Sequence, residues 1–225
     1  MKKAFALLLL AALFPLASPA HGAAEASARE QLERDGIAFT PEAFLQTVAG
    51  GDAKHTALFL EAGIDPSVKT SNGRTALWLA TERRQLEALK ALLAGGVAPN
   101  VQNAPAVEYG KTIVFEAVDT GDAAYVRALV EAGADAKTAN EYEVPPLAEA
   151  ARTGNLEMCQ ILLKAGADPN AAPAGFPLLY GPVNEDHPDV VKLLLASGAR
   201  LGEHKQGLVD AAKNPEMRAL LEAAE

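Results

Sequence analysis

One short phrase returns through the chain at nearly constant spacing, and it constrains the fold more than any other feature. The phrase joins two aliphatic residues to small residues and a glycine, as in 129–135 and 162–168. Its closing glycines are Gly63, Gly96, Gly133, Gly166 and Gly198. They are separated by 33, 37, 33 and 32 residues. Repetition at this period is the sequence signature of an array of stacked structural units.

Each unit is predicted to hold two short helices followed by a loop. In the fourth unit, Pro146 suits the first turn of a helix and Gly154 ends that helix. A second helix over 156–164 ends at Gly166, where a left-handed backbone is wanted. A glycine keeps the register of Gly154 in the first and third units, and Arg84 stands in for it in the second. Because neither helix can bury its apolar side alone, neighbouring units must stack.

Three segments, 73–80, 146–151 and 166–170, carry a family resemblance. They resemble the ankyrin repeat, in which Gly-x-Thr-Pro-Leu-His-x-Ala-Ala is followed by Val-x-x-Leu-Leu-x-x-Gly-Ala-Asp-x-Asn. The resemblance runs from about residue 40 to the last residue. It implies an all-α solenoid of stacked helix-turn-helix units with hairpin-like loops, about five repeats plus terminal caps.

The chain departs from that pattern in several units. The family histidine is missing from every unit, and Trp78 occupies its place in the second, so apolar packing is expected to replace its polar contacts. The loop at 101–111 is four residues longer than the period requires. Prolines and a glycine interrupt the first helix and following turn of the fifth unit, at Pro177, Gly181, Pro182 and Pro188.

Both ends of the array are expected to be caps, because terminal repeats must present a polar outer side. Residues 26–34 predict a charged helix with Leu32 facing inward. Apolar residues that follow it, Ile37, Phe39 and Phe44, are expected to close the first end of the core. Residues 207–224 suit a polar cap at the other end.

The first twenty residues have the three-part build of a secretory signal. Lys2 and Lys3 precede the apolar run 4–14, and the small residues of 18–20 place cleavage after Ala20, with Gly22 or Ala24 as alternatives. An uncleaved anchor is the other interpretation, but eleven apolar residues span only about 16 Å, roughly half of a bilayer core. We therefore expect a signal peptide (1–20), an N-terminal segment with a capping helix (21–39) and an ankyrin domain (40–225). The expected location is the bacterial periplasm, with secretion beyond it left open and no stable membrane anchor after cleavage.

Charge and cysteine content narrow the class of partner. Removal of Lys2 and Lys3 from the 20 basic residues leaves 18 against 29 acidic ones, a formal charge of −11. Such a surface repels phosphate backbones, so a nucleic-acid partner is not expected. Cys159 is the only cysteine, and its position on an apolar helix side predicts a buried hydrophobe rather than a reactive thiol.

The sequence offers no recognisable catalytic pattern. His55, His187 and His204 lie in different units without a metal-ligand partner at i+3 or i+4. No serine stands in a Gly-x-Ser-x-Gly turn, and no Gly-Lys-Ser/Thr follows Gly95-Gly96. We expect neither an enzyme nor a metal site or cofactor.

The loops are more informative. Glu108-Tyr109 and Glu141-Tyr142 are 33 residues apart, so stacking should place two acidic-aromatic pairs side by side at adjacent loop tips. Tyrosine recurs at recognition surfaces, although both tyrosines could simply cover the loops beneath them. In ankyrin proteins, partners are generally held by the loop tips and the concave side of the first helices. Applied to the repeat positions of this chain, that arrangement implies the following neighbours of the tyrosines: Arg74, Glu82, Arg83, Lys111, Asp119, Thr120, Arg152 and Thr153.

The sequence thus predicts a monomeric, periplasmic interaction module that binds and supports or regulates another envelope protein. A second hypothesis is an immunity or inhibitor protein that blocks the active site of a toxin or enzyme. It rests on the acidic charge and on the irregular loops at 101–111 and 171–187. An enzyme with an unfamiliar site is a third.

Overall fold

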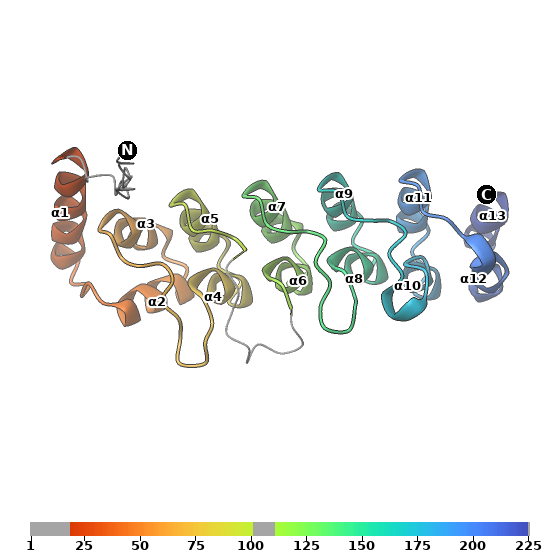
Figure 1. The fold of residues 1–225 in the computed structure, drawn as a ribbon, viewed down its shortest axis with the longest axis horizontal. Helices are drawn as coiled ribbons and strands as arrows, with labels where there is room; N and C mark the ends of the chain where they lie inside the picture. Colours follow the sequence, from red (N-terminus) through yellow and green to blue (C-terminus); the bar gives the residue numbers. More distant parts are fainter. Residues whose placement is uncertain (1–18, 101–110, 225) are drawn as a thin grey trace, which may run out of the picture.

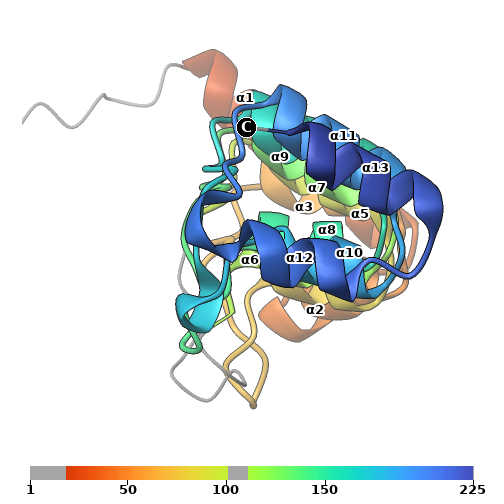
Figure 2. The same ribbon diagram turned by 90° about the vertical axis from the view of Figure 1, so that its right-hand side faces the viewer.

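Two parallel rows of short helices form an elongated stack in the computed structural model, which describes residues 19–100 and 111–224 (Figure 1). The first helices of the units form one row: α2 (Pro41–Ala49), α4 (Ala76–Glu82), α6 (Ile113–Asp119), α8 (Pro146–Arg152), α10 (Tyr180–Asn184) and α12 (Lys205–Ala211). The second helices form the other row: α3 (Ala53–Glu61), α5 (Leu86–Ala94), α7 (Ala123–Glu131), α9 (Leu156–Lys164), α11 (Pro188–Ala196) and α13 (Pro215–Ala223). Seen from the end, the two rows form two layers with the connecting loops along one side (Figure 2). The predicted all-α repeat solenoid is confirmed.

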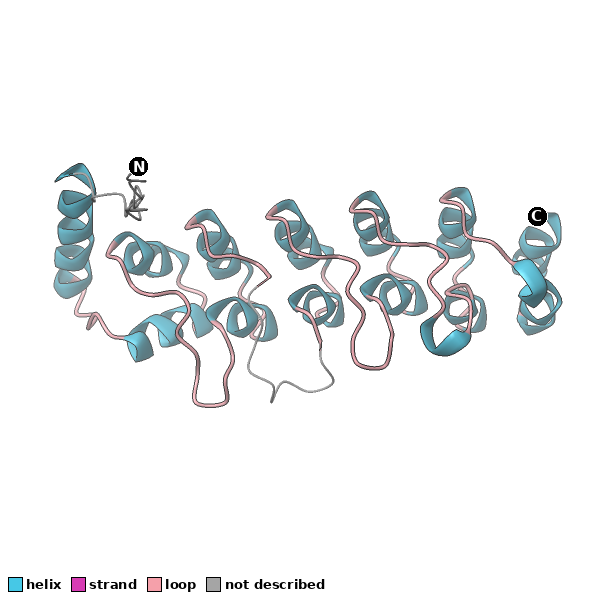
Figure 3. Cartoon of the chain, viewed as in Figure 1, coloured by secondary structure: helices cyan, strands magenta, loops and turns pink. Residues whose placement is uncertain are grey.

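Long loops join one unit to the next and project past the row of first helices (Figure 3). We call the loops 62–75 and 132–145 the first finger and the third finger. In the first finger, Lys69 and Thr75 form an isolated antiparallel bridge, which is the only β-pairing among the described residues. The expected long loop at 101–111 lies, apart from Lys111, outside the described residues.

Local sequence explains why the helices begin and end where they do. The hydroxyl oxygens of Thr75 and Thr112 accept hydrogen bonds from backbone N–H groups three residues later, which caps α4 and α6. At the turn between the two helices of a unit, Gly154 has a φ of +72°. Arg84 has a φ of +58° at the same place in the second unit, so its predicted role as a stand-in for glycine is confirmed.

A continuous apolar core runs the length of the stack. Each second helix packs against its neighbours in the row, as in α3, α5, α7 and α9, and each first helix does the same. Leucines from successive second helices are fully buried: Leu89, Leu92, Leu129, Leu162 and Leu194. Replacement of one such leucine by alanine typically costs about 2–5 kcal/mol.

Neighbouring units are also joined by side-chain amides near the glycine-ended phrases. Asn100 donates a hydrogen bond through Nδ2 to the carbonyl oxygen of Gly133, at 3.0 Å. Its Oδ1 accepts one from the backbone N–H of Asp135, at 2.9 Å. Each such amide fixes the register of one unit on the next.

The N-terminal cap is longer than predicted. The helix α1 extends over Pro19–Arg34 rather than 26–34, and it packs against α3. Leu32 is fully buried as expected, and Phe39 and Phe44 pack against the ring of Phe59. The guanidinium of Arg29 donates to the carbonyl oxygen of Ala62 and lies 4.4 Å from the centre of the Phe39 ring.

A histidine fastens α1 to the first unit. His55 Nε2 lies 2.9 Å from a carboxylate oxygen of Asp35, just beyond α1, and Nδ1 lies 2.5 Å from Asp52, the N-cap of α3. These contacts raise the pKa of His55, and the contact with Asp52 contributes more to this shift than the contact with Asp35. The same contacts lower the pKa of both carboxyl groups. The contact couples the docking of α1 to the protonation of His55.

The fifth unit and the C-terminal cap follow the predicted irregularity. The helix α10 has only five residues, and two short 3-10 turns, η2 (Pro173–Gly175) and η3 (Gly202–His204), flank this unit. In the cap, α12 and α13 bury Leu208 and Leu221, while Met217 is a buried residue that the sequence pattern did not single out. None of the helices in residues 19–100 and 111–224 is long and apolar enough to cross a membrane.

Candidate functional site

Charged side chains lie on, or just before, the first helices of the second, third and fourth units. We call this set the charge ladder: Arg74, Glu82, Lys111, Glu116, Asp119, Glu149 and Arg152. Arg74 in the first finger forms an ion pair with Glu82 at the end of α4. Lys111 precedes α6 and contacts Asp119 at its end, at 2.5 Å. The structure therefore brings these four predicted site residues into two matching pairs.

Arg152 extends the ladder into the fourth unit. Its guanidinium donates two hydrogen bonds to the carboxylate of Glu149, one turn earlier on α8. This contact, followed by attraction to Glu185 and Asp119, raises the pKa of Arg152. Asp119 belongs to the third unit and Glu185 to the fifth, so carboxylates of both neighbouring units attract Arg152.

The remaining predicted site residues are more dispersed. Arg83 is exposed at the C-cap of α4, and Thr153 is exposed at the end of α8. Thr120 is only 8% exposed, and its hydroxyl donates to the carbonyl of Ala117. The prediction that Thr120 belongs to the recognition surface is therefore wrong, because its side chain closes the end of α6.

Glu141 and Tyr142 lie on the third finger. Tyr142 is 56% exposed, and the side-chain oxygen Oδ1 of Asn140 accepts hydrogen bonds from the backbone N–H groups of Tyr142 and Val144, each at 3.0 Å. These bonds hold the finger tip in a defined turn. Glu108 and Tyr109 lie outside the described residues, so the expected pairing of two tyrosines stays a prediction.

Sequence reasoning missed two members of the ladder, Glu116 and Glu149. They are 33 residues apart, so the repeat period itself could have found them. Glu116 is half-buried on α6, and burial raises the pKa of its carboxyl group. Lys111 and Arg74 oppose that shift, whereas Asp119 and Glu82 add to it.

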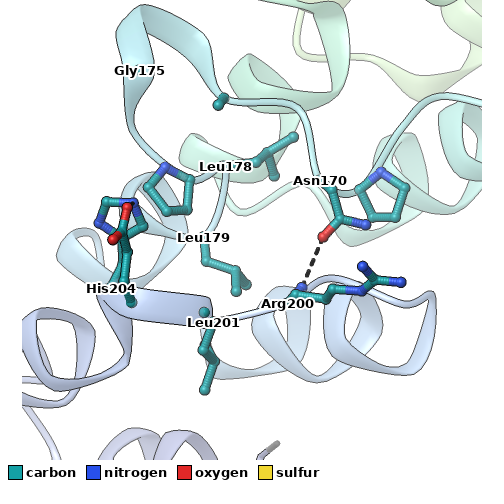
Figure 4. A pocket seen from close by; sticks show the side chains of 12 residues that line it. Asn170, Gly175, Leu178, Leu179, Arg200, Leu201 and His204 are labelled. Carbon is teal, nitrogen blue, oxygen red and sulfur yellow. Dashed lines mark hydrogen bonds and ion pairs between the residues drawn. The ribbon is translucent and has the colours of Figure 1, made fainter.

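A pocket of about 250 Å³ lies at the other end of the molecule, between the loops that contain η2 and η3 (Figure 4). Leu178, Leu179 and Leu201 line it, together with Arg200 and His204. Its volume falls below the range of about 300–1,000 Å³ that is typical of small-molecule sites. Leu178 and Leu179 belong to the irregular loop 171–187 that motivates the inhibitor hypothesis.

Histidine, cysteine and carboxylate side chains are the groups of this chain that could hold a metal ion or act in catalysis. Within residues 19–100 and 111–224, no three His, Cys, Asp or Glu side chains form a group that could hold a metal ion. Cys159 is fully buried, as predicted, and burial raises the pKa of its thiol to about 12. A thiol of that kind stays protonated at neutral pH and is a poor nucleophile.

The comparisons with known proteins agree with this geometry. A family model described as ankyrin repeats (3 copies) matches residues 44–140 and again 77–173, together more than half of the 225 residues. A search of the curated proteins gives no significant match. The chain therefore belongs to the ankyrin-repeat family, whose repeats are protein–protein interaction modules and generally non-catalytic.

Proposed function

We propose that this chain is an exported, non-enzymatic protein that binds and supports or regulates another protein of the bacterial envelope. The observation that carries the proposal is the position of the charge ladder beside the fingers. The fingers project from one edge of the stack (Figure 1), and the ladder residues lie on or just before the first helices α4, α6 and α8. Exposed tyrosine beside mixed charge is a common composition of protein-binding surfaces.

Rigidity supports this role. The third finger is held by hydrogen bonds to Asn140. The helix α8, which follows the finger in the chain, begins with two prolines, Pro145 at the N-cap and Pro146 at the first position. A preorganised loop loses little conformational entropy when a partner binds, so more of the contact energy becomes affinity. Tyr142 is thus presented on a stiff support.

Capture of the partner tests the surface. The full chain, tagged at its C-terminus and expressed in its native host, is cross-linked and purified from the envelope fraction. We expect Tyr142→Ala, together with Tyr109→Ala, to lower capture by at least about tenfold, because buried tyrosines commonly dominate interfaces. Phe176→Ala is the matched control, since Phe176 is equally exposed at 58% but lies on another loop.

Retention of the same partner by the double tyrosine variant at the wild-type level would remove the fingers from the proposal. If the captured protein is an enzyme or toxin that loses activity on binding, the inhibitory alternative is favoured over a supporting role. Unchanged thermal midpoints of all variants are needed for either conclusion.

The export proposal rests on the leader sequence and has its own test. Fractionation of the host should place the chain in the periplasm, and intact-mass measurement should show a mature protein that begins at His21. A chain that retains residues 1–20 in the membrane fraction would contradict cleavage.

A further inference from the structure

Glu116 and Glu149 occupy equivalent positions in neighbouring units, but their surroundings differ. Glu149 accepts two hydrogen bonds from Arg152, which lies three residues later on the same helix. Among the described residues, no group donates a hydrogen bond to the Glu116 carboxylate or forms an ion pair with it. The cause lies in the sequence, because the position equivalent to Arg152 is occupied by Asp119, which is itself a carboxylate.

The cations that surround Glu116 already have partners. Lys111 contacts Asp119, and Arg74 forms an ion pair with Glu82. Both cations attract Glu116 from a longer distance, while Asp119 and Glu82 repel it. Glu116 and the four groups acting on it thus comprise three carboxylates and two cations, which leaves a local charge of −1 at neutral pH.

Burial makes this arrangement costly for the free protein. Glu116 is partly withdrawn from water, and a withdrawn carboxylate without a hydrogen-bonded partner is destabilised. The site lies on α6, midway along the ladder between α4 and α8 (Figure 1). A cation that arrives there gains the missing contacts and neutralises the local charge.

We infer that Glu116 binds a basic side chain, arginine or lysine, that the partner protein inserts between the Arg74–Glu82 and Lys111–Asp119 pairs. The inference rests on the proposed function and specifies the chemistry of its partner. Arginine suits the site best, because its planar fork can contact Glu116 and a neighbouring carboxylate together. The two flanking pairs hold the competing charges apart and so keep Glu116 available to the partner.

The test uses a phage-displayed library of random twelve-residue peptides selected on the full mature chain. We expect the selected peptides to carry at least one arginine or lysine. Replacement of that residue by glutamine in the synthetic peptide should raise the Kd by about tenfold or more, since a charge-assisted hydrogen bond is lost. Glu116→Gln should raise the Kd of the original peptide by a similar factor.

A double-mutant cycle makes the assignment specific. When Glu116→Gln is combined with the substituted peptide, the Kd should rise little beyond either single change, because both remove the same contact. Glu157→Gln is the control, since Glu157 lies on α9, outside the charge ladder, and its carboxylate forms an ion pair with Arg127. That variant should leave the Kd within about twofold of the wild-type value.

The outcomes separate this inference from the proposed function. Peptides that bind without a basic residue, or cycles that are additive, overturn the role of Glu116 while leaving recognition by the ladder intact. Selection of no peptide that competes with the captured envelope partner overturns both. Circular dichroism of Glu116→Gln guards against a folding defect, because loss of an unpartnered, partly buried charge should not lower the thermal midpoint.

Discussion

Asn170 clamps its own unit to the next one through the backbone at Arg200. The side-chain oxygen Oδ1 of Asn170 accepts a hydrogen bond from the backbone N–H of Arg200 at 2.9 Å (Figure 4), and Nδ2 of Asn170 donates one to the carbonyl oxygen of Gly198 at 2.9 Å. Asn100 makes the same pair of bonds to Gly133 and Asp135. One side chain thus satisfies two backbone groups in the loop of the following unit.

Loss of this clamp should destabilise the C-terminal part of the stack. Asn170→Ala removes two hydrogen bonds, so we expect the free energy of unfolding to fall by about 1–2 kcal/mol. Urea denaturation followed by circular dichroism measures the change. Asn184→Ala, an exposed asparagine at the end of α10, should stay within about 0.5 kcal/mol of the wild type. Equal losses in the two variants would show that the clamp does not contribute.

Trp78 provides a second test of stability. It is 2% exposed, and its indole N–H has no hydrogen-bond partner among the described residues. Trp78→Phe removes that unsatisfied donor, so the lost packing should be largely offset and the change should stay within about 1 kcal/mol. Trp78→Ala should cost about 3–5 kcal/mol because it leaves a cavity. A Trp78→Phe loss as large as that of Trp78→Ala would mean that the N–H is satisfied after all.

Alanine substitutions at two glycines distinguish the cost of backbone strain from the cost of a steric clash. Gly154 and Gly133 both have positive φ, +72° and +87°, so alanine at either position costs about 1–2 kcal/mol. A Cβ at Gly154 would also lie 2.5 Å from the His187 ring, whereas a Cβ at Gly133 meets no atom within 4 Å. Gly154→Ala should therefore be worse than Gly133→Ala by about 1–3 kcal/mol in thermal or urea unfolding. Equal effects would show that His187 moves aside freely.

The His55 contact predicts a pH-dependent attachment of α1. The pKa of His55 is raised above its usual 6.5, so its contribution to stability is complete below pH 6.5 and is lost as pH rises through the folded value. The pKa values of Asp35 and Asp52 are lowered below their usual 3.8, so their contribution is complete above pH 3.8 and is lost as pH falls through their folded values. The stabilisation that these contacts give to the folded chain is therefore greatest between pH 3.8 and pH 6.5.

The thermal midpoint of the wild type, compared with that of His55→Ala across pH 4 to 9, checks this sign. The difference should be largest in the acidic part of that range and should shrink as the solution becomes alkaline. Asp35→Asn should show the same trend. A difference that grows with pH would contradict it.

Cys159 should be chemically silent in the folded chain. Because its thiol is buried and its pKa is raised to about 12, iodoacetamide should modify it only when the protein unfolds. Mass spectrometry should show no modification at neutral pH and complete modification in concentrated urea. Rapid labelling of the native protein would mean that α9 opens readily.

The sequence by itself determined the repeat, its period and the ends of the helices of the fourth unit, whereas the start of α1 was not predicted. The phrase that closes at Gly133 or Gly166 encodes a helix and its left-handed stop in a few consecutive residues, so it can be read without knowledge of the rest of the chain. Even the substitution of Arg84 for a glycine was recognised by register and is confirmed by its positive φ. The burial of Leu32 and Cys159 followed from the same periodicity.

Only the tertiary structure decided which charges meet. Arg74 lies in the first finger and Glu82 at the end of α4, so their ion pair depends on how the finger folds back toward that helix. The contact of His55 with Asp35 likewise needs the packing angle of α1 on α3. Periodicity fixes the side of a helix on which a residue lies, whereas an ion pair between separate segments forms only where the fold brings the two side chains to the same point in space.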